Sequence, residues 1–136
     1  MKIIKDKFFI SPSDLNNFVA CKYTIKNEIK FLNKEITKNT DRVNDKLWKE
    51  MGIEHEKKHH KILKTKYKKS IEIKLAKDEQ SRFDETVDAM QKGYDLIYHA
   101  YLIDENFRGE ADFLIKTNTP SDLGDYSYEV YDIKIT

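Results

Sequence analysis

Two short segments near the end of the chain place charged residues among strand-forming apolar ones. They are residues 109–115 (GEADFLI) and 129–134 (EVYDIK). An ionised side chain in such apolar sequence must be paired or bind a cation, because an isolated buried charge is costly to desolvate. Asp132 and Lys134 are two residues apart, so on a strand both project from the same face. We therefore expect Asp112, Asp132 and Lys134 to be buried around one metal ion.

This set of residues has the parts needed to hydrolyse a phosphodiester. Carboxylates bind a hard cation such as Mg²⁺ through oxygen, and the cation polarises a phosphoryl oxygen and lowers the pKa of bound water. A neighbouring lysine stabilises the negative charge that develops during the reaction. The residue types and their spacing favour metal-assisted phosphate chemistry.

Hydrophobic periodicity places both segments on strands of an α/β chain. Apolar residues that recur three, four or seven apart predict helices, and alternation with a period of two predicts strands. The predicted helices cover residues 11–22, 41–63 and 79–93, and the predicted strands cover residues 70–75, 96–103, 107–116 and 127–135. Ser11 and Pro12 are suited to a helix start, and Gly93 to a helix end. The order α, α, β, α, β, β, β predicts a mixed sheet with helices against it.

The second predicted helix is capped by Asp41 and carries a histidine on its apolar stripe. The stripe consists of Val43, Leu47, Met51, His55, Ile62 and Leu63. Gly52 lies inside this helix, where glycine costs about 1 kcal/mol relative to alanine. We expect Gly52 either to end the helix or to let another group approach closely.

Composition bounds the class of protein. The chain has 136 residues, of which 39% are hydrophobic and 36% charged, so we expect a single domain, residues 1–136, with no membrane span. The charged first residues do not resemble a signal peptide. A single cysteine, Cys21, agrees with a reducing compartment. We expect a cytoplasmic protein.

Charge is distributed unevenly along the chain. Residues 1–79 carry 20 Lys and Arg against 12 Asp and Glu, a net of +8, while residues 80–136 carry 5 against 12, a net of −7. This asymmetry suits a protein whose N-terminal helices contact the phosphates of a polyanion while its C-terminal strands hold cations. A solvated, lysine-rich surface is the equally weighted alternative.

Five segments together resemble the PD-(D/E)xK nuclease superfamily, and within it the RecB-like nucleases. They are residues 11–15 (SPSDL), 52–56 (GIEHE), 95–102 (DLIYHAYL), 109–114 (GEADFL) and 128–134 (YEVYDIK). The resemblance covers nearly the whole chain. It implies a restriction-endonuclease-like core, in which helices flank a mixed sheet, and cleavage of DNA.

The resemblance also implies roles for individual residues. Asp112 and Asp132 would ligate the metal, and Lys134 would be the catalytic lysine. His55 would be a further ligand from the preceding helix, and the backbone carbonyl of Ile133 would join it. Such a mixed set of histidine and carboxylates accepts Mn²⁺ at least as readily as Mg²⁺.

Two positions depart from the family pattern or extend it. Glu110 stands where relatives usually carry a basic residue, and it either repels phosphate or lies beside the ligands. Glu56 is expected beside the ligands or as an alternate ligand.

Cys21 lies where some relatives have the first cysteine of an iron–sulfur cluster, but the later cysteines are absent, so no such cluster is expected within this chain. The sequence stops just after the lysine motif, which suggests the N-terminal part of a longer domain or protein.

Three functions stay open at this stage. The first is a Mg²⁺- or Mn²⁺-dependent DNA nuclease acting in repair, recombination or defence, on single- or double-stranded DNA. The second is a nuclease-like module that does not cut and serves a larger helicase–nuclease as a nucleic-acid-binding or assembly part, with a helicase domain or subunit as partner. The third is an unrelated α+β protein whose acids and lysine form structural ion pairs.

Single residues also have plainer interpretations. Taken alone, His55 is more often a hydrogen-bonded core histidine than a ligand. His59 and His60 are interpreted as surface residues of the helix, and His99 as a sheet residue. The lysines of the second helix either contact phosphates or solvate its outer face. The four lysines expected to bind nucleic acid are Lys57, Lys58, Lys61 and Lys64.

Overall fold

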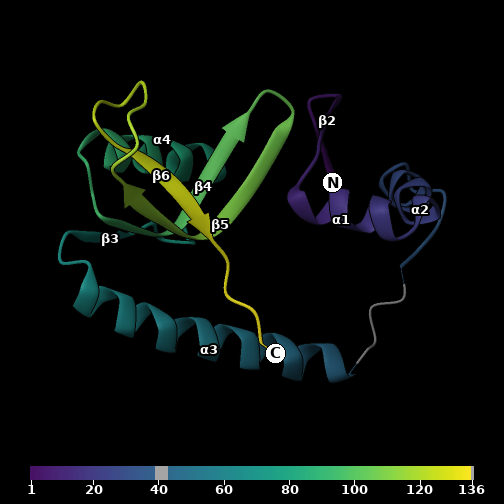
Figure 1. The fold of residues 1–136 in the computed structure, drawn as a ribbon. Helices are drawn as coiled ribbons and strands as arrows, with labels where there is room; N and C mark the ends of the chain where they lie inside the picture. Colours follow the sequence, from purple (N-terminus) through teal and green to yellow (C-terminus); the bar gives the residue numbers. More distant parts are fainter. Residues whose placement is uncertain (39–42, 136) are drawn as a thin grey trace. The chain divides into compact units, whose positions relative to one another are not determined.

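The computed structural model describes residues 1–38 and 43–135 (Figure 1). Contacts divide the chain into two compact units. The N-terminal unit comprises Met1–Arg42 and Ile103–Gly109, and the sheet unit comprises Val43–Leu102 and Glu110–Thr136. All the predicted catalytic and metal-binding residues belong to the sheet unit. The predicted cap at Asp41 lies outside the described residues.

The N-terminal unit contains more structure than the sequence pattern predicted. Strands β1 (Lys2–Ile4) and β2 (Lys7–Phe9) pair antiparallel, and helices α1 (Pro12–Ala20) and α2 (Lys22–Leu32) follow. The helix start at Ser11 is confirmed: the Asp14 carboxylate accepts hydrogen bonds from the Ser11 backbone N–H at 2.8 Å and from its hydroxyl at 2.7 Å. The hairpin was not predicted because its strands have only three residues each. Helix α2 was missed although Ile25, Ile29 and Leu32 recur at helical spacing within its lysine-rich sequence.

A mixed four-stranded sheet organises the second unit, as predicted. Its strand order is β3 (Ser70–Glu72), β4 (Leu96–Asp104), β5 (Phe107–Thr117) and β6 (Ser127–Tyr131). Strand β3 runs parallel to β4, and β5 runs antiparallel to β6. Helix α4 (Glu79–Gln91) connects the parallel pair, as a parallel connection requires.

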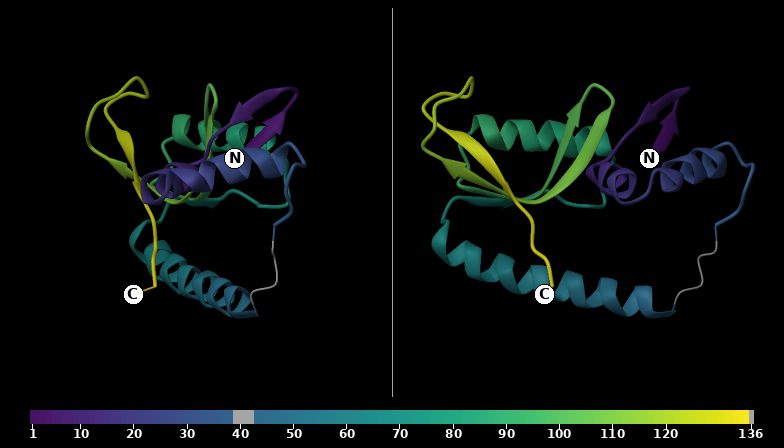
Figure 2. Two further views of the ribbon diagram at one scale, coloured as in Figure 1. Left: turned by 90° about the vertical axis from the view of Figure 1, so that its right-hand side faces the viewer. Right: turned by 45° about the vertical axis from the view of Figure 1, so that its right-hand side comes forward.

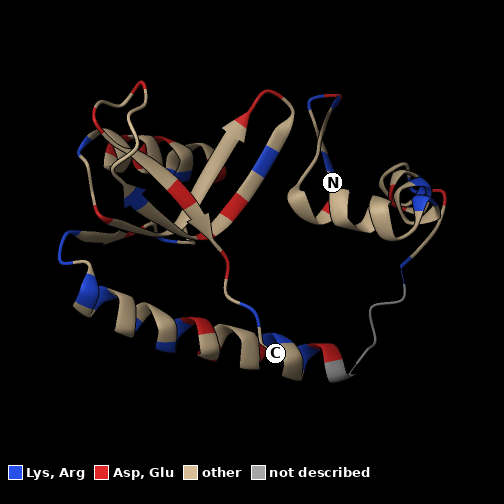
Figure 3. Ribbon diagram, in the orientation of Figure 1, with Lys and Arg blue, Asp and Glu red and all other residues tan. Residues whose placement is uncertain are grey.

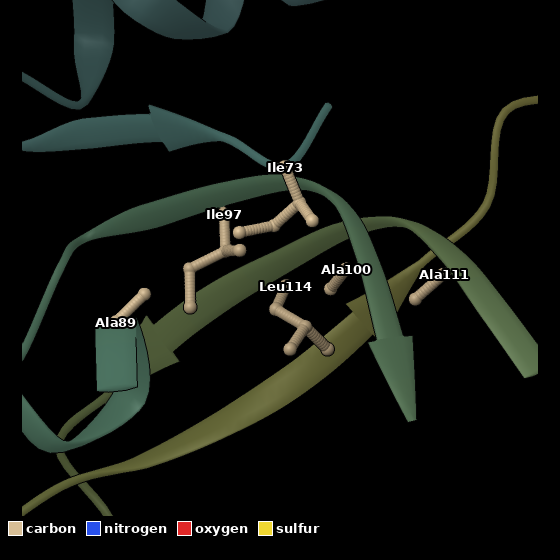
Figure 4. Packing of buried hydrophobic residues seen from close by; sticks show 6 residues of the cluster. All are labelled: Ile73, Ala89, Ile97, Ala100, Ala111 and Leu114. Carbon is tan, nitrogen blue, oxygen red and sulfur yellow. The ribbon is translucent and has the colours of Figure 1, made fainter. Parts of the chain in front are cut away.

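Helices flank both faces of this sheet (Figures 1 and 2). On one face, Ala89 of α4 packs in a buried cluster with Ile97 and Leu114 (Figure 4). On the other face, Leu63 of helix α3 (Val43–Lys66) packs against a cluster that includes Phe113. The sheet therefore has an α4 face and an α3 face.

The two central strands do not alternate regularly between these faces. Ile97 and Ala100 both belong to the cluster on the α4 face, although they are three residues apart. The two residues between them, Tyr98 and His99, both face α3. This break in alternation coincides with a left-handed backbone at His99, whose φ is 57°.

Three details of the predicted elements are corrected. Strand β6 ends at Tyr131, so residues 132–134 follow the strand rather than lie on it. Gly52 neither ends the helix nor marks a close approach, since α3 continues through it and a Cβ there would meet nothing within 4 Å. Strand β3 is shorter than the predicted strand 70–75.

Three members of the apolar stripe predicted for α3 face solvent. Leu47, Met51 and Ile62 are exposed by 57%, 42% and 64%. The inward side of the second half of α3 carries His60, which was not predicted there, and Leu63, which was. Several polar residues face inward here, so hydrophobicity alone identified only part of the inward side.

Candidate active site

Two carboxyl groups meet where β5 and the end of β6 lie side by side. The side chains of Asp112 and Asp132 share a hydrogen bond, and Asp112 also accepts one from the Ile133 backbone N–H at 2.9 Å. Lys134 Nζ lies 2.6 Å from Asp132 Oδ2. The structure thus brings together three residues predicted for the site.

The proximity of the two carboxyls shifts their pKa values in opposite directions. Burial raises the pKa of Asp112 to about 6, and the hydrogen bond with Asp132 and the charges of Glu56 and Asp132 raise it as well. The hydrogen bonds from Asp112 and Lys134 lower the pKa of Asp132. Below about pH 6 a proton on this pair relieves the repulsion between the two carboxyls, and above that pH both are ionised and repel each other unless a cation binds.

The expectation that both acids and the lysine are buried is wrong for two of the three. Asp112 is half-buried, but the side chains of Asp132 and Lys134 are exposed by 51% and 77%. The chain has left the sheet at Tyr131, so neither side chain is covered by neighbouring strands. The lysine is accessible to a ligand, and its exposed ion pair contributes little to stability.

Helix α3 adds a third carboxylate, that of Glu56. Its Oε1 accepts a hydrogen bond from the Tyr98 hydroxyl at 2.8 Å and another from His99 Nε2. The charge of Glu56 contributes to the raised pKa values of both Asp112 and Lys134. Glu56 is therefore the residue of α3 whose charge acts on the acid cluster.

His55, the predicted ligand from α3, makes other contacts. Its ring packs edge-on against His59, with centroids 4.5 Å apart, and its backbone carbonyl accepts from His59 Nδ1 at 3.2 Å. Within the described part of the chain, it forms no hydrogen bond with either aspartate. Its role as a ligand stays a prediction, as does that of the Ile133 carbonyl.

Glu110 is held in an ion pair with a residue of α4. Arg82 Nη2 of α4 lies 2.6 Å from Glu110 Oε2 and 3.2 Å from the His99 carbonyl oxygen, to which it donates. The Arg82 side chain is only 8% exposed, so its charge needs this partner. Glu110 serves first to balance a buried guanidinium.

The histidine His60, interpreted as a surface residue, is buried. It is 7% exposed and packs on Tyr98 with ring centroids 3.9 Å apart. Burial and the charge of Lys64 lower its pKa, so it is neutral near pH 7. Its spacing of four from Glu56 was the available signal, because both lie on one side of the helix.

A cavity of about 580 Å³ lies between α3 and the sheet. Three lysines of α3 line it together with polar groups of α3 and the sheet: Lys57, Lys61, Lys64, Glu56, His99 and Glu110. Blue segments recur along α3 in Figure 3, where lysines alternate with other residues. Lys58, the fourth predicted lysine, pairs instead with Glu54 at 3.2 Å and does not line the cavity.

The donor chemistry of the acid pair fits a hard divalent cation. Asp112 and Asp132 present oxygen donors in one place, and a cation bound between them would offset their mutual repulsion. Among residues 1–38 and 43–135, no group of three or more His, Cys, Asp or Glu is assembled as a ready metal site. The site thus offers a cation the carboxylates of Asp112 and Asp132, and the charge of Glu56 acts on Asp112 as well.

No helix in the described part of the chain is long and apolar enough to cross a membrane. Comparisons with protein-family models, with curated proteins and with solved structures found no match to this chain.

Proposed function

We propose that this chain is a metal-dependent DNA nuclease domain of the RecB-like, PD-(D/E)xK kind, with a restriction-endonuclease-like version of its mixed sheet. The observation that carries the proposal is the meeting of Asp112, Asp132 and Lys134 from two chain segments, next to Glu56. Structural ion pairs alone would not need two carboxyls in hydrogen-bond contact, since that contact costs repulsion whenever both are charged.

The proposed roles follow from charge and exposure. Asp112 and Asp132 would hold Mg²⁺ or Mn²⁺, whose chemistry there would be to polarise a phosphoryl oxygen and to lower the pKa of a bound water. Lys134 is exposed beside Asp132, where its ammonium would stabilise a phosphate oxygen. Glu56 keeps a negative charge facing the pair.

The lysines that line the cavity support a polyanionic substrate. Lys57, Lys61 and Lys64 are spaced by four and three residues, so they form one row on α3, about 6 and 4.5 Å apart along the helix axis. A row of this kind suits successive phosphates of a nucleic-acid strand. Glu110 is already neutralised by Arg82, which reduces its repulsion of phosphate.

The test is cleavage of single- and double-stranded DNA with Mn²⁺. Asp112→Asn keeps the size of the side chain, and we expect it to lower activity by more than the 10–100-fold typical of losing a group that only orients a ligand. Lys134→Ala should also lower cleavage strongly. Lys58→Ala is the matched control, because it removes another exposed, ion-paired lysine. Equal activity in all four proteins would refute the proposal.

A nucleic-acid-binding module that does not cut is the second candidate function. The row of lysines favours it, because phosphate binding by lysine needs no metal. Salt-sensitive DNA binding that is unchanged by Asp112→Asn, together with no Mn²⁺-dependent turnover, would select this candidate.

A further inference from the structure

The histidine at position 99 has a backbone conformation that its residue type disfavours. Its φ of 57° lies in the left-handed region, inside strand β4. Outside glycine, this region is uncommon and energetically costly, and such strain is concentrated where a structure needs an unusual side-chain direction. Packing alone therefore does not explain why a histidine with this backbone conformation stands at position 99.

The strained backbone changes the side of the sheet that His99 faces. In a regular strand, successive side chains point to opposite faces, so the neighbour of Tyr98 would face α4. Here the rings of Tyr98 and His99 stack with centroids 3.7 Å apart. Both reach the same atom, Glu56 Oε1, with a hydroxyl and an imidazole nitrogen.

The conformation is also held from the opposite side. Arg82 Nη2 donates to the His99 carbonyl oxygen at 3.2 Å, and the same guanidinium is anchored by Glu110 at 2.6 Å. The His99 side chain is only 12% exposed. Backbone and imidazole are thus fixed by separate groups.

Two donors on one oxygen leave Glu56 little freedom to rotate. A flexible glutamate on a helix would otherwise sample several rotamers and point into the cavity. With its Oε1 fixed, the charge of Glu56 stays where it acts on Asp112 and Lys134.

We propose that His99 is a positioning residue, whose left-handed backbone and imidazole fix the Glu56 carboxylate beside the Asp112–Asp132 pair and so raise the affinity of that pair for a divalent cation. The effect on cation affinity rests on the proposed function, whereas the fixed position of the Glu56 carboxylate is independent of it.

The first test compares two variants that remove the same imidazole. His99→Gly adopts a positive φ without penalty, whereas His99→Ala does not. We expect the glycine variant to have the higher melting temperature, although glycine normally weakens a strand. An alanine variant of equal or greater stability would overturn the claim that the backbone is strained.

The second test measures Mn²⁺ binding by calorimetry on the same proteins. We expect both variants to bind about tenfold more weakly than the native chain, as is typical when a group that orients ligands is lost. His99→Gln, which can still donate from its terminal nitrogen, should recover part of this affinity. Unchanged binding in His99→Gly and His99→Ala would overturn the proposed effect on the cation.

A double-mutant cycle separates this inference from the proposed function. The stabilities of His99→Ala, Glu56→Gln and the double variant, measured without metal, should be non-additive because the two side chains share a hydrogen bond. If the native chain bound no Mn²⁺ but the cycle showed coupling, the nuclease proposal would fail while the positioning of Glu56 stood. Additive stabilities would show that His99 does not fix Glu56.

Discussion

The two faces of the sheet are built from the same strands and each has a buried apolar cluster, but the α3 face also carries the candidate site. The α4 face holds Ile97, Ala100 and Leu114, which are at most 2% exposed and apolar. The α3 face places Tyr98, His99 and Asp112 in contact with, or in electrostatic range of, Glu56. The comparison teaches that the α4 face contributes mainly packing, whereas the α3 face combines a packed cluster with the polar groups of the candidate site.

The largest expected difference between the faces concerns stability. Ile97→Ala should lower the free energy of unfolding by about 2–5 kcal/mol, because it removes buried methyl groups and leaves a cavity. Tyr98→Phe, the next residue on the other face, loses only the hydroxyl bond to Glu56, which is worth about 1 kcal/mol. Denaturant unfolding of both variants checks this. Similar losses in the two would break the comparison.

The pH dependence of stability should show that ionising Asp112 on the α3 face destabilises the fold. The pKa of Asp112 is raised from 3.8 to about 6 in the folded chain. Its contribution to stability is therefore complete below about pH 4 and is lost as the pH rises through 6. The pKa of Asp132 is lowered, so its own contribution is lost only at more acidic pH.

We expect the melting temperature without metal to fall between pH 4 and 6 relative to Asp112→Asn, which lacks this titrating group. Thermal unfolding across this range is the measurement. Parallel profiles for the native chain and Asp112→Asn would contradict the raised pKa. Adding Mn²⁺ at pH 7 should raise the native melting temperature and leave that of Asp112→Asn nearly unchanged.

The smallest effect concerns the lysines of the cavity. If Lys61 contacts a phosphate, Lys61→Ala should reduce the slope of log affinity against log salt by about 0.7 to 0.9. Lys58→Ala should leave this slope unchanged, because Lys58 pairs with Glu54 outside the cavity. DNA binding measured over a salt series distinguishes the two. Equal slopes for the two variants would show that Lys61 of the lysine row does not contact a phosphate.

Prediction from sequence succeeded where local interactions decide the structure. Alternation and helical spacing located the hairpin of β4 and β5, helix α4 and its end near Gly93, whose φ is 70°. The same patterns failed for the inward face of α3. There His60 is buried because it stacks on Tyr98, a partner nearly forty residues away.

Residues of the site show the same division. Asp112, Asp132 and Lys134 were found because charge is unusual in strand sequence, and the structure brings them together. Arg82 and His99 were missed as site residues, because nothing in their sequence neighbours marks a buried guanidinium or a left-handed strand residue. A glycine or asparagine at position 99 would have signalled that backbone.

The sequence by itself determined which segments form the sheet and which acids and lysine are candidates for chemistry, because period and residue type are local properties. Only the tertiary structure decided which face each of these side chains occupies, that Glu56 rather than His55 contacts Tyr98 and His99, and that Glu110 balances Arg82. These choices depend on groups that are distant in sequence and meet only when the sheet and its helices pack.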